Sequence, residues 1–458
     1  MGPGRRRRRF WLTWWIVLAA QAASCLGAAK TTALAPPPTT TTSTWIPPRW
    51  FRNLWRRHRK FRVLVLMSDT GGGHRASALA LAQALEKLYP GAFDIELLDI
   101  WSAAGVWPLN QLVRAYKYLG RRPMLWRLLW YSTASVVTRG TIKAWHDAQH
   151  RRRFASELGR RRFDAVVSVH PLTQHVPLSA LRQELKSTVP FVTVVTDLGS
   201  AHPMWFDSRV DRVFVPNAKV ARLAMSHGLE RRQITEHGLP LRAAFFAGPT
   251  PWTSWKQHRR RRLEQLAQRR AIPGVAIVGG GGGVGRLDRL VDEAIRALEA
   301  RAQRAHLTVI CGTNRGLRAA LDNRPPSRYV RIRTEGFVSN IHDIMARSDV
   351  LLTKAGPGTI AEAATLGLPV LLTTFLPGQE RGNARLVVDR GFGVLERRPD
   401  KVAALLCDWL DDPAKLAQLS QRAFDAAKPD STDKIATDIA SMLFSSIDDP
   451  TTRDQNLN

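Results

Sequence analysis

Two series of short apolar runs constrain the fold of this 458-residue chain more than any other feature. The runs are rich in Val, Ile and Leu without polar alternation, as are strands buried on both faces of a parallel sheet. Amphipathic stretches such as 76–89 and 287–302 lie between runs, so the sequence predicts βαβ units. The first series occupies residues 62–68, 93–100, 164–170, 191–197 and 212–216, and the second occupies 275–280, 307–312, 329–336, 349–354 and 369–374.

The two series predict an α/β protein with two Rossmann-like, doubly wound domains that face each other across a cleft. We expect an N-terminal domain over residues 61–250 and a C-terminal domain, with terminal helices, over residues 271–430. The Pro-, Trp- and Arg-rich segment near residues 245–270 shows no strand pattern, and we interpret it as the connection. Residues 446–458 are polar and are expected to form a frayed tail.

Residues 1–60 have the composition of a targeting leader. Arg5–Arg9 precede the apolar run 10–20, and small residues follow it. The next segment is rich in Thr and Pro, and no acidic residue occurs before Asp69. A signal-like part followed by a transit-like part therefore predicts targeting, with removal of the leader. A single uncleaved membrane anchor is the alternative.

The formal net charge is +30, which favours contact with either phosphate backbones or an anionic membrane. Composition does not choose between the two. Cys25, Cys311 and Cys407 are far apart and lack metal-ligand spacing, so Cys311 and Cys407 are expected to be buried thiols. No Asp-x-Asp pair stands at the end of a predicted strand, so we expect no obligatory metal.

A glycine-rich turn follows the first predicted strand in each of the two series. In "MSDTGGGHR", Gly72 and Gly73 precede His74 at the start of a predicted helix. The second turn, "GGGGGVG", contains Gly280 and Gly281. Such strand–helix turns indicate anion or ligand binding at a helix N-terminus. An imidazole at this place is a candidate proton acceptor, with a loop-capping role as the alternative.

The stretch "TKAGPGTIAEA" combines a strand end with another helix N-terminus. Its geometry predicts a diphosphate cradle to which the Lys354 ammonium adds positive charge. Glu362 lies one helical turn later, within reach of a ribose hydroxyl pair. Downstream, "LPGQERGN" offers polar side chains suited to a sugar. The candidate residues of these two segments are Lys354, Gly356, Pro357, Gly358, Thr359, Glu362, Gln379, Glu380 and Asn383.

A further group follows the strand at residues 191–197. "TDLGSAHPMWF" brings Asp197, His202 and Trp205 beyond the strand end. An aromatic ring beside a carboxylate and an imidazole is suited to a sugar or lipid site, and ordinary loop packing is the alternative.

These motifs, taken in order, resemble the monogalactosyldiacylglycerol synthases of plastids, with bacterial diacylglycerol glucosyltransferases and MurG as more distant relatives. The resemblance covers roughly residues 62–430. It implies a GT-B fold and an inverting transfer of galactose from UDP-galactose to the free hydroxyl of diacylglycerol. No cofactor beyond the donor is implied. Where the family has Glu in its second glycine loop this chain has Gly282, which puts donor affinity or sugar choice in question.

The resemblance also assigns roles. His74 matches the proposed catalytic base, and we add Asp197 as a second catalytic candidate. The residues 356–359 match the diphosphate loop, and Glu362 matches the ribose contact. Phe337 and Val338 match the uracil-binding turn, while Gln379 and Glu380 match the sugar contacts.

Residues 101–155 interleave Trp, Tyr and Leu with Arg and Lys, and Asp147 is their only acid. This pattern predicts docking on an anionic bilayer, from which diacylglycerol enters. Trp126, Arg127 and Trp130 are the candidate contacts, together with His202 and Trp205 on the acceptor side. A buried helical hairpin with a basic outer face is the alternative. Anionic lipid is expected as an activator, as the resemblance implies.

Three other functions are weighed against galactosyl transfer. One is a glucosyltransferase that uses UDP-glucose, and another is a UDP-sugar epimerase with the same two-domain plan. The third is a non-catalytic basic protein, but no RNA-binding pattern is present and no nucleic-acid partner is expected. We expect peripheral association with the plastid envelope, and the sequence leaves assembly open between a monomer and a homodimer.

Overall fold

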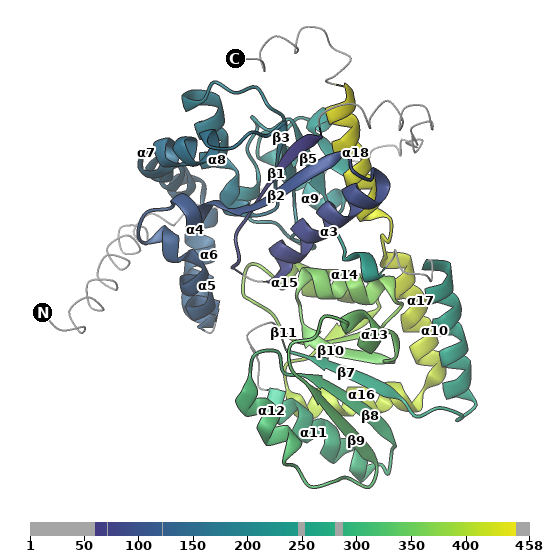
Figure 1. Ribbon diagram of the computed structural model, residues 1–458. Helices are drawn as coiled ribbons and strands as arrows, with labels where there is room; N and C mark the ends of the chain where they lie inside the picture. The colour runs from purple at the N-terminus through teal and green to yellow at the C-terminus, as the bar shows by residue number, and fades with distance from the viewer. Residues whose placement is uncertain (1–59, 71, 121, 246–251, 280–286, 446–458) are drawn as a thin grey trace, which may run out of the picture.

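Two six-stranded sheets form the frame of the molecule (Figure 1). The computed structural model describes residues 60–70, 72–120, 122–245, 252–279 and 287–445. The strand order is β2-β1-β3-β4-β5-β6 in the first sheet and β12-β11-β10-β7-β8-β9 in the second. All neighbouring strands pair in parallel. The predicted α/β architecture with two doubly wound halves is therefore confirmed.

The first sheet comes from the N-terminal half of the chain. Its strands β3 and β4 are buried at every residue, which explains why their sequences are apolar without alternation. The sequence predicted five of its strands but not the short edge strand β6. The strands are β1 (Phe61–Met67), β2 (Phe93–Asp99), β3 (Ala165–Ser168), β4 (Phe191–Val194), β5 (Arg212–Val215) and β6 (Ile234–Glu236).

The second sheet comes from the C-terminal half. Its central strand β7 is buried throughout, and the short edge strand β12 was not predicted. The strands are β7 (Gly274–Val278), β8 (Ala305–Ile310), β9 (Val330–Glu335), β10 (Val350–Lys354), β11 (Val370–Thr374) and β12 (Gly393–Leu395).

Helices cover the sheets and connect the strands (Figure 1). In the N-terminal half they are α3 (Gly72–Leu88), α4 (Ile100–Ala104), α5 (Leu112–Gly120), α6 (Pro123–Ala134), α7 (Val136–Gly159), α8 (His175–Ser179) and α9 (Ala218–Ser226). Later in the chain they are α10 (Trp252–Ala267), α11 (Leu287–Ala300), α12 (Arg315–Asp322), α13 (Ile341–Ala346), α14 (Pro357–Thr365), α15 (Arg381–Arg390), α16 (Pro399–Asp411), α17 (Pro413–Ala426) and α18 (Ser431–Ser445).

The last helix, α18, crosses back to the N-terminal half, a placement that the sequence analysis did not predict. Figure 1 shows it beside α3. Its buried residues Ile435, Ile439 and Leu443 recur at helical spacing and share a core with Ala78 and Leu81 of α3. The terminal helices therefore do not all belong to the C-terminal domain, and the halves are joined twice.

The connection near residues 245–270 is largely the helix α10. Its Arg259 is only 2% exposed, although it belongs to a run of four arginines that appears solvated in the sequence. The guanidinium donates to the Ser348 carbonyl at 2.6 Å and pairs with the buried Asp349. A buried charge is tolerated because it is paired in this way. The helix therefore packs as part of the C-terminal half.

Candidate functional site

His74 lies in the first turn of α3, just after β1, and is partly exposed. Its Nδ1 atom lies 2.9 Å from the Val169 carbonyl oxygen and 3.0 Å from Thr196 Oγ1. A carbonyl only accepts hydrogen bonds, so Nδ1 carries the proton of the neutral ring. Nε2 is then left with the lone pair. This tautomer presents a proton acceptor at the end of the first sheet.

Burial lowers the pKa of His74 to about 4, partly offset by the hydrogen bond to Val169. The ring is therefore neutral at physiological pH. It lies edge-on to His170, with 4.5 Å between ring centroids. His170 accepts from the Leu172 amide through Nδ1 and so donates to Thr70 Oγ1 through Nε2. The sequence analysis did not select His170, although its place at the end of the predicted strand 164–170 was an available indication.

Asp197 and Trp205 form a hydrogen-bonded pair close to His74. The Trp205 ring is fully buried, lies 6.2 Å from the His74 ring between centroids, and donates through Nε1 to Asp197 Oδ2 at 2.7 Å. Burial raises the pKa of Asp197 to about 6, and the hydrogen bond from Trp205 opposes that rise. The structure thus brings together three residues that the sequence predicted, from two segments about 125 residues apart.

His202 is also in this group, but its ring is occupied by structural hydrogen bonds. Nδ1 accepts from the Met204 amide at 3.2 Å, so Nε2 donates to Thr133 Oγ1 at 3.1 Å. Burial lowers its pKa to about 4. His202 therefore links the loop after β4 to helix α6.

The N-terminus of α14 forms the centre of the site in the C-terminal half. Gly356 is its N-cap and Pro357 opens the helix. The amides of Gly358 and Thr359 lie in the first turn, where a helix offers no internal acceptor and carries partial positive charge. The Lys354 Nζ atom lies 3.7 Å from the position that a Cβ on Gly356 would take. The predicted diphosphate cradle thus combines backbone N–H groups that have no acceptor within the helix with the Lys354 ammonium.

The loop between β11 and α15 is fixed to this cradle. Glu380 is 3% exposed, forms an ion pair with Lys354 and accepts from the Leu376 amide at 2.9 Å. Asn383 donates from Nδ2 to the Ala355 carbonyl at 3.0 Å. Both side chains were predicted to contact a sugar. In the structure they also hold the loop in place.

This loop and the first turn of α15 contact the N-terminal half directly. The Gly199 amide donates to Asn383 Oδ1 at 2.7 Å, and Ser200 Oγ donates to the Gln379 carbonyl at 3.1 Å. Gly199 and Gly382 pack so closely that a Cβ on Gly199 would lie 2.0 Å from the Gly382 oxygen. The loop after β4 therefore meets the β11–α15 loop and the first turn of α15, and this contact joins the two halves close to Asp197 in the chain.

Glu362 has a partner that the sequence did not indicate. The carboxylate is 6% exposed and accepts from Arg242 Nε and Nη2, each at 2.8 Å. Burial raises the pKa of Glu362, and the Arg242 charge opposes this effect. A ribose contact by Glu362 remains a prediction, and any such contact shares the carboxylate with Arg242.

The other predicted donor contacts differ in their surroundings. Phe337 is 82% exposed, whereas Val338 is half-buried against the C-terminal core. Gly72 and Gly73 are exposed, and a Cβ on either would meet no atom within 4 Å. This open space leaves the backbone accessible to a ligand. Gly280, Gly281 and Gly282 lie outside the described residues.

The membrane contacts predicted in α6 need correction. Trp126 is 7% exposed and packs edge-on against Tyr116, with 4.9 Å between centroids, while Trp130 lies 4.5 Å from the His202 ring. The two rings point inward because they occupy the helix face toward the site. Arg127 is exposed as predicted. The exposed apolar side chains of α6 are instead Met124 (86%), Leu128 (49%) and Tyr131 (51%).

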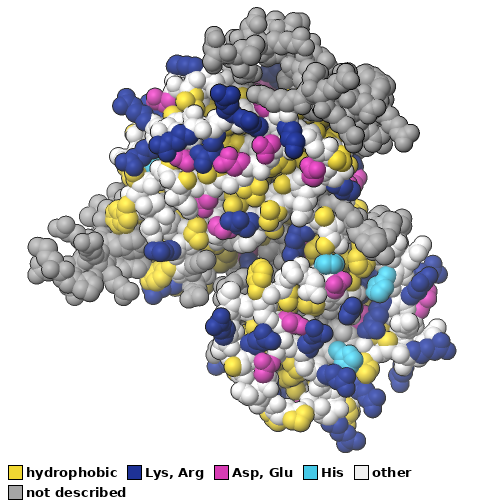
Figure 2. Space-filling view, in the orientation of Figure 1, with side chains coloured by type: hydrophobic (Ala, Val, Ile, Leu, Met, Phe, Trp, Pro, Cys, Tyr) yellow, Lys and Arg dark blue, Asp and Glu magenta, His cyan; other side chains and the backbone are white. Residues whose placement is uncertain are grey.

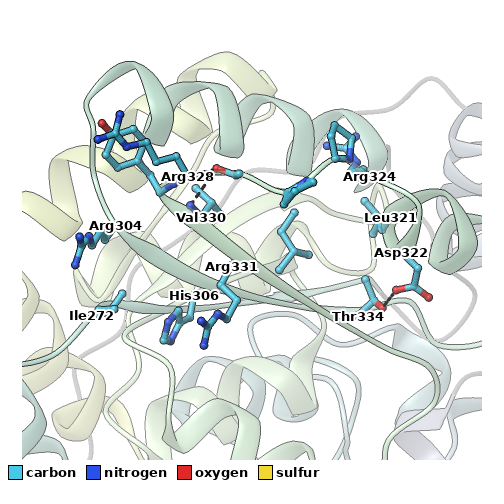
Figure 3. Close-up of a pocket in the computed structure, with 15 residues that line it drawn as sticks. Ile272, Arg304, His306, Leu321, Asp322, Arg324, Arg328, Val330, Arg331 and Thr334 are labelled. Atoms are coloured by element: carbon cyan, nitrogen blue, oxygen red, sulfur yellow. Dashed lines mark hydrogen bonds between the residues drawn. The ribbon is translucent and has the colours of Figure 1, made fainter.

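A surface cavity of about 620 Å³ lies at the edge of the second sheet, along β9 (Figure 3). The four arginines Arg304, Arg324, Arg328 and Arg331 line it, and none of the predicted site residues does. Basic side chains are in fact spread over both halves of the face seen in Figure 2. The cavity is thus separate from the site between the halves.

Two predictions from composition also concern the described residues. Cys311 and Cys407 are buried free thiols, as expected, whereas Cys25 lies outside the described part of the chain. Within that part, no group of three or more His, Cys, Asp and Glu side chains is arranged to hold a metal ion. None of the helices described there is long and apolar enough to cross a bilayer.

Comparison with known proteins gives a consistent result. Residues 74–241 match the family model described as monogalactosyldiacylglycerol (MGDG) synthase, and residues 274–435 match that of the glycosyltransferase family 28 C-terminal domain. The chain is 35% identical over 390 residues to monogalactosyldiacylglycerol synthase 1, chloroplastic, of Arabidopsis thaliana, covering 84% of this chain and 72% of the relative. For the Spinacia oleracea monogalactosyldiacylglycerol synthase, identity is 37% over 387 residues, covering 83% and 72%.

Solved structures show the same fold at low identity. Acinetobacter baumannii MurG has a TM-score of 0.55 at 15% identity, covering 83% of this chain and all of that chain. A UDP-GlcNAc 2-epimerase from Neisseria meningitidis has a TM-score of 0.50 at 12% identity, covering 84% and 100%. Transferases and epimerases thus share this architecture, so the fold alone does not separate the two activities.

Proposed function

The chain belongs to the monogalactosyldiacylglycerol synthase family, and from this premise we propose how it acts. It is a glycosyltransferase that moves galactose from UDP-galactose to the free hydroxyl of 1,2-diacylglycerol, with inversion at the anomeric carbon. One observation carries the proposed mechanism. His74 holds its proton on Nδ1, against Val169, which leaves the lone pair on Nε2, and its ring lies 6.2 Å from that of Trp205, the partner of Asp197.

His74 acts as the general base. Its Nε2 takes the proton of the diacylglycerol hydroxyl while that oxygen attacks the anomeric carbon, and the bond from this carbon to the β-phosphate oxygen breaks. Such proton transfer typically contributes about 10²–10⁴-fold to the rate. The Asp197 carboxylate, which accepts a hydrogen bond from Trp205, stabilises the positive charge that develops on the His74 imidazole and on the sugar.

The C-terminal half binds the donor and stabilises the leaving diphosphate. The first-turn amides of α14 and the Lys354 ammonium supply positive charge where UDP departs. Gln379, Glu380 and Asn383 bind the galactose hydroxyls. Phe337 and Val338 bind the uracil, while Glu362 binds the ribose beside Arg242. No metal is required, because the first-turn amides of α14 and the Lys354 ammonium stabilise the negative charge on the leaving diphosphate, as a divalent ion does in other enzymes.

Diacylglycerol reaches His74 from a bilayer on which the protein docks peripherally. Met124, Leu128 and Tyr131 recur at helical spacing on the outer face of α6, next to exposed Arg127. Apolar groups on such a helix enter the interface while cations meet anionic head groups. We therefore assign membrane docking to this face, with anionic lipid as the activator. The curated relatives are named as chloroplastic, and we place the protein on the plastid envelope after removal of its leader.

The decisive experiment identifies the lipid product. Purified protein is incubated with diacylglycerol vesicles and labelled UDP-galactose or UDP-glucose in separate reactions. We expect galactosyl-diacylglycerol in the reaction with UDP-galactose and no glycosylated lipid in the reaction with UDP-glucose. A glucosylated lipid would assign the glucosyltransferase alternative instead. Epimerised UDP-sugar in a reaction without lipid, together with no lipid product, would contradict transfer altogether.

A further inference from the structure

The α5–α6 hairpin reaches across the interface to the loop between β11 and α15. Tyr116 Oη donates to Gln379 Oε1 at 3.4 Å. The Trp130 indole covers Gly378 so closely that a Cβ there would lie 2.2 Å from Trp130 Cδ1. Gly378 also has a φ of +83°, a conformation that favours glycine. The turn at 378–379 is thus shaped to fit two side chains of the other half.

Helix α6 carries two functions on opposite faces. Trp126, Trp130 and Thr133 turn inward, toward Tyr116 and His202. The exposed set at 124, 128 and 131 has the same spacing but is displaced by two residues, about 200° around the helix. The helix whose outer face we assign to membrane docking therefore touches the loop between β11 and α15 with its inner face.

The Tyr116 hydroxyl orients the Gln379 side chain. Gln379 accepts from Tyr116 through Oε1, and it also acts to lower the pKa of Asp197, against the larger effect of burial. Burial raises the pKa of Tyr116, as do the charges of Glu380 and Asp197, so its hydroxyl stays protonated and donates. With Oε1 engaged by Tyr116, the Gln379 amide nitrogen is left as the donor that the side chain can offer to a ligand.

We propose that Tyr116 and Trp130 are positioning residues for the donor sugar. They fix the orientation of the Gln379 amide and the path of the backbone at Gly378, so the hairpin of the N-terminal half is part of the sugar site of the C-terminal half. This inference rests on the proposed function, in which Gln379 binds galactose. It predicts that the hairpin affects affinity for the sugar of UDP-galactose but not affinity for UDP.

Calorimetric titration of Tyr116→Phe with UDP-galactose and with UDP tests the inference. Losing one neutral hydrogen bond predicts a Kd for UDP-galactose about fivefold higher, with the Kd for UDP unchanged. Tyr118→Phe is the matched control, since Tyr118 lies in the same helix and contacts Arg122, with 4.4 Å from the guanidinium carbon to the ring centroid. The control is expected to bind both ligands as the wild type does. Equal shifts for both ligands, or no shift for either, would overturn the inference.

A double-mutant cycle shows whether Tyr116 acts through Gln379. In a Gln379→Ala background, Tyr116→Phe is expected to add nothing to the loss of UDP-galactose affinity, because the bond is already absent. Additive losses would assign Tyr116 a different role. Trp130→Phe, which keeps an aromatic ring over Gly378, is expected to retain more affinity than Trp130→Ala. Equal affinity in the two variants would contradict the role of Trp130.

These binding measurements do not depend on transfer. A wild-type protein that makes no galactolipid while Tyr116→Phe still weakens only UDP-galactose would refute the proposed reaction and leave the hairpin's role intact. If the wild type makes galactolipid and Tyr116→Phe binds UDP-galactose with unaltered affinity, the proposed reaction stands and the role of the hairpin is refuted.

Discussion

The contact between Gly199 and Gly382 offers a test of how tightly the two halves must meet. Replacing Gly199 with Ala adds a methyl group 2.0 Å from the Gly382 oxygen and 2.2 Å from its carbonyl carbon. Contacts to Cβ shorter than about 3 Å do not occur, so the two loops must separate by at least about 1 Å. This movement also weakens the bond from the Gly199 amide to Asn383.

The expected result is a loss of turnover with retained nucleotide binding. A misplacement of about 1 Å between reacting groups costs roughly 100-fold in rate. UDP binding is expected to stay within twofold, because the α14 cradle lies wholly in the C-terminal half. Galactolipid formation from labelled UDP-galactose gives kcat, and calorimetry gives the Kd for UDP.

Gly140→Ala is the matched control, since a Cβ on Gly140 meets no atom within 4 Å. It is expected to leave kcat unchanged. Thermal unfolding of both variants establishes that they are folded. A folded Gly199→Ala variant with near-normal kcat would refute the idea that close contact between these loops aligns His74 with the donor.

Three further predictions concern charge and surface. In the wild type, protonation of the Asp197 carboxylate is expected to lower kcat/KM as the pH falls through about 6. Asp197→Asn is expected to remove this acidic limb of the pH profile. A profile that keeps the limb would exclude Asp197 as its source. The pKa of His74 is about 4 in the folded protein and near 6.5 in the unfolded chain, so unfolding takes up a proton between these pH values. The free energy of unfolding is therefore expected to fall as the pH drops from 6.5 toward 4. Urea unfolding at each pH measures this fall, which is expected to be smaller in His74→Gln. Met124→Ser with Leu128→Ser is expected to reduce co-sedimentation with phosphatidylglycerol vesicles several-fold without changing UDP affinity; unchanged sedimentation would place the docking surface elsewhere.

The frame was predictable because each central strand is buried on both faces and so must be apolar along its whole length. Strands β6 and β12 were missed because each has three residues at a sheet edge, too short for a pattern. Helix α18 has a clear apolar face, but sequence periodicity does not tell which half covers it. Its partner α3 lies more than 300 residues earlier.

The site was predictable where chemistry and position coincide in one segment, as for His74 after β1 and Lys354 after β10. Contacts between distant segments left no such trace. Arg242 pairs with Glu362 across 120 residues, and neither side chain marks the other in the sequence. The aromatic residues of α6 showed that the helix meets an apolar environment, but not that the environment of Trp126 is protein rather than lipid.

Turnover by His74→Ala tests the central claim most directly. The account predicts that galactolipid formation falls by about 10²–10⁴-fold while the Kd for UDP stays within twofold, because the variant loses the proton acceptor and keeps the α14 cradle. Near-wild-type turnover in the folded variant would contradict the assignment of His74 as the base and, with it, the proposed mechanism.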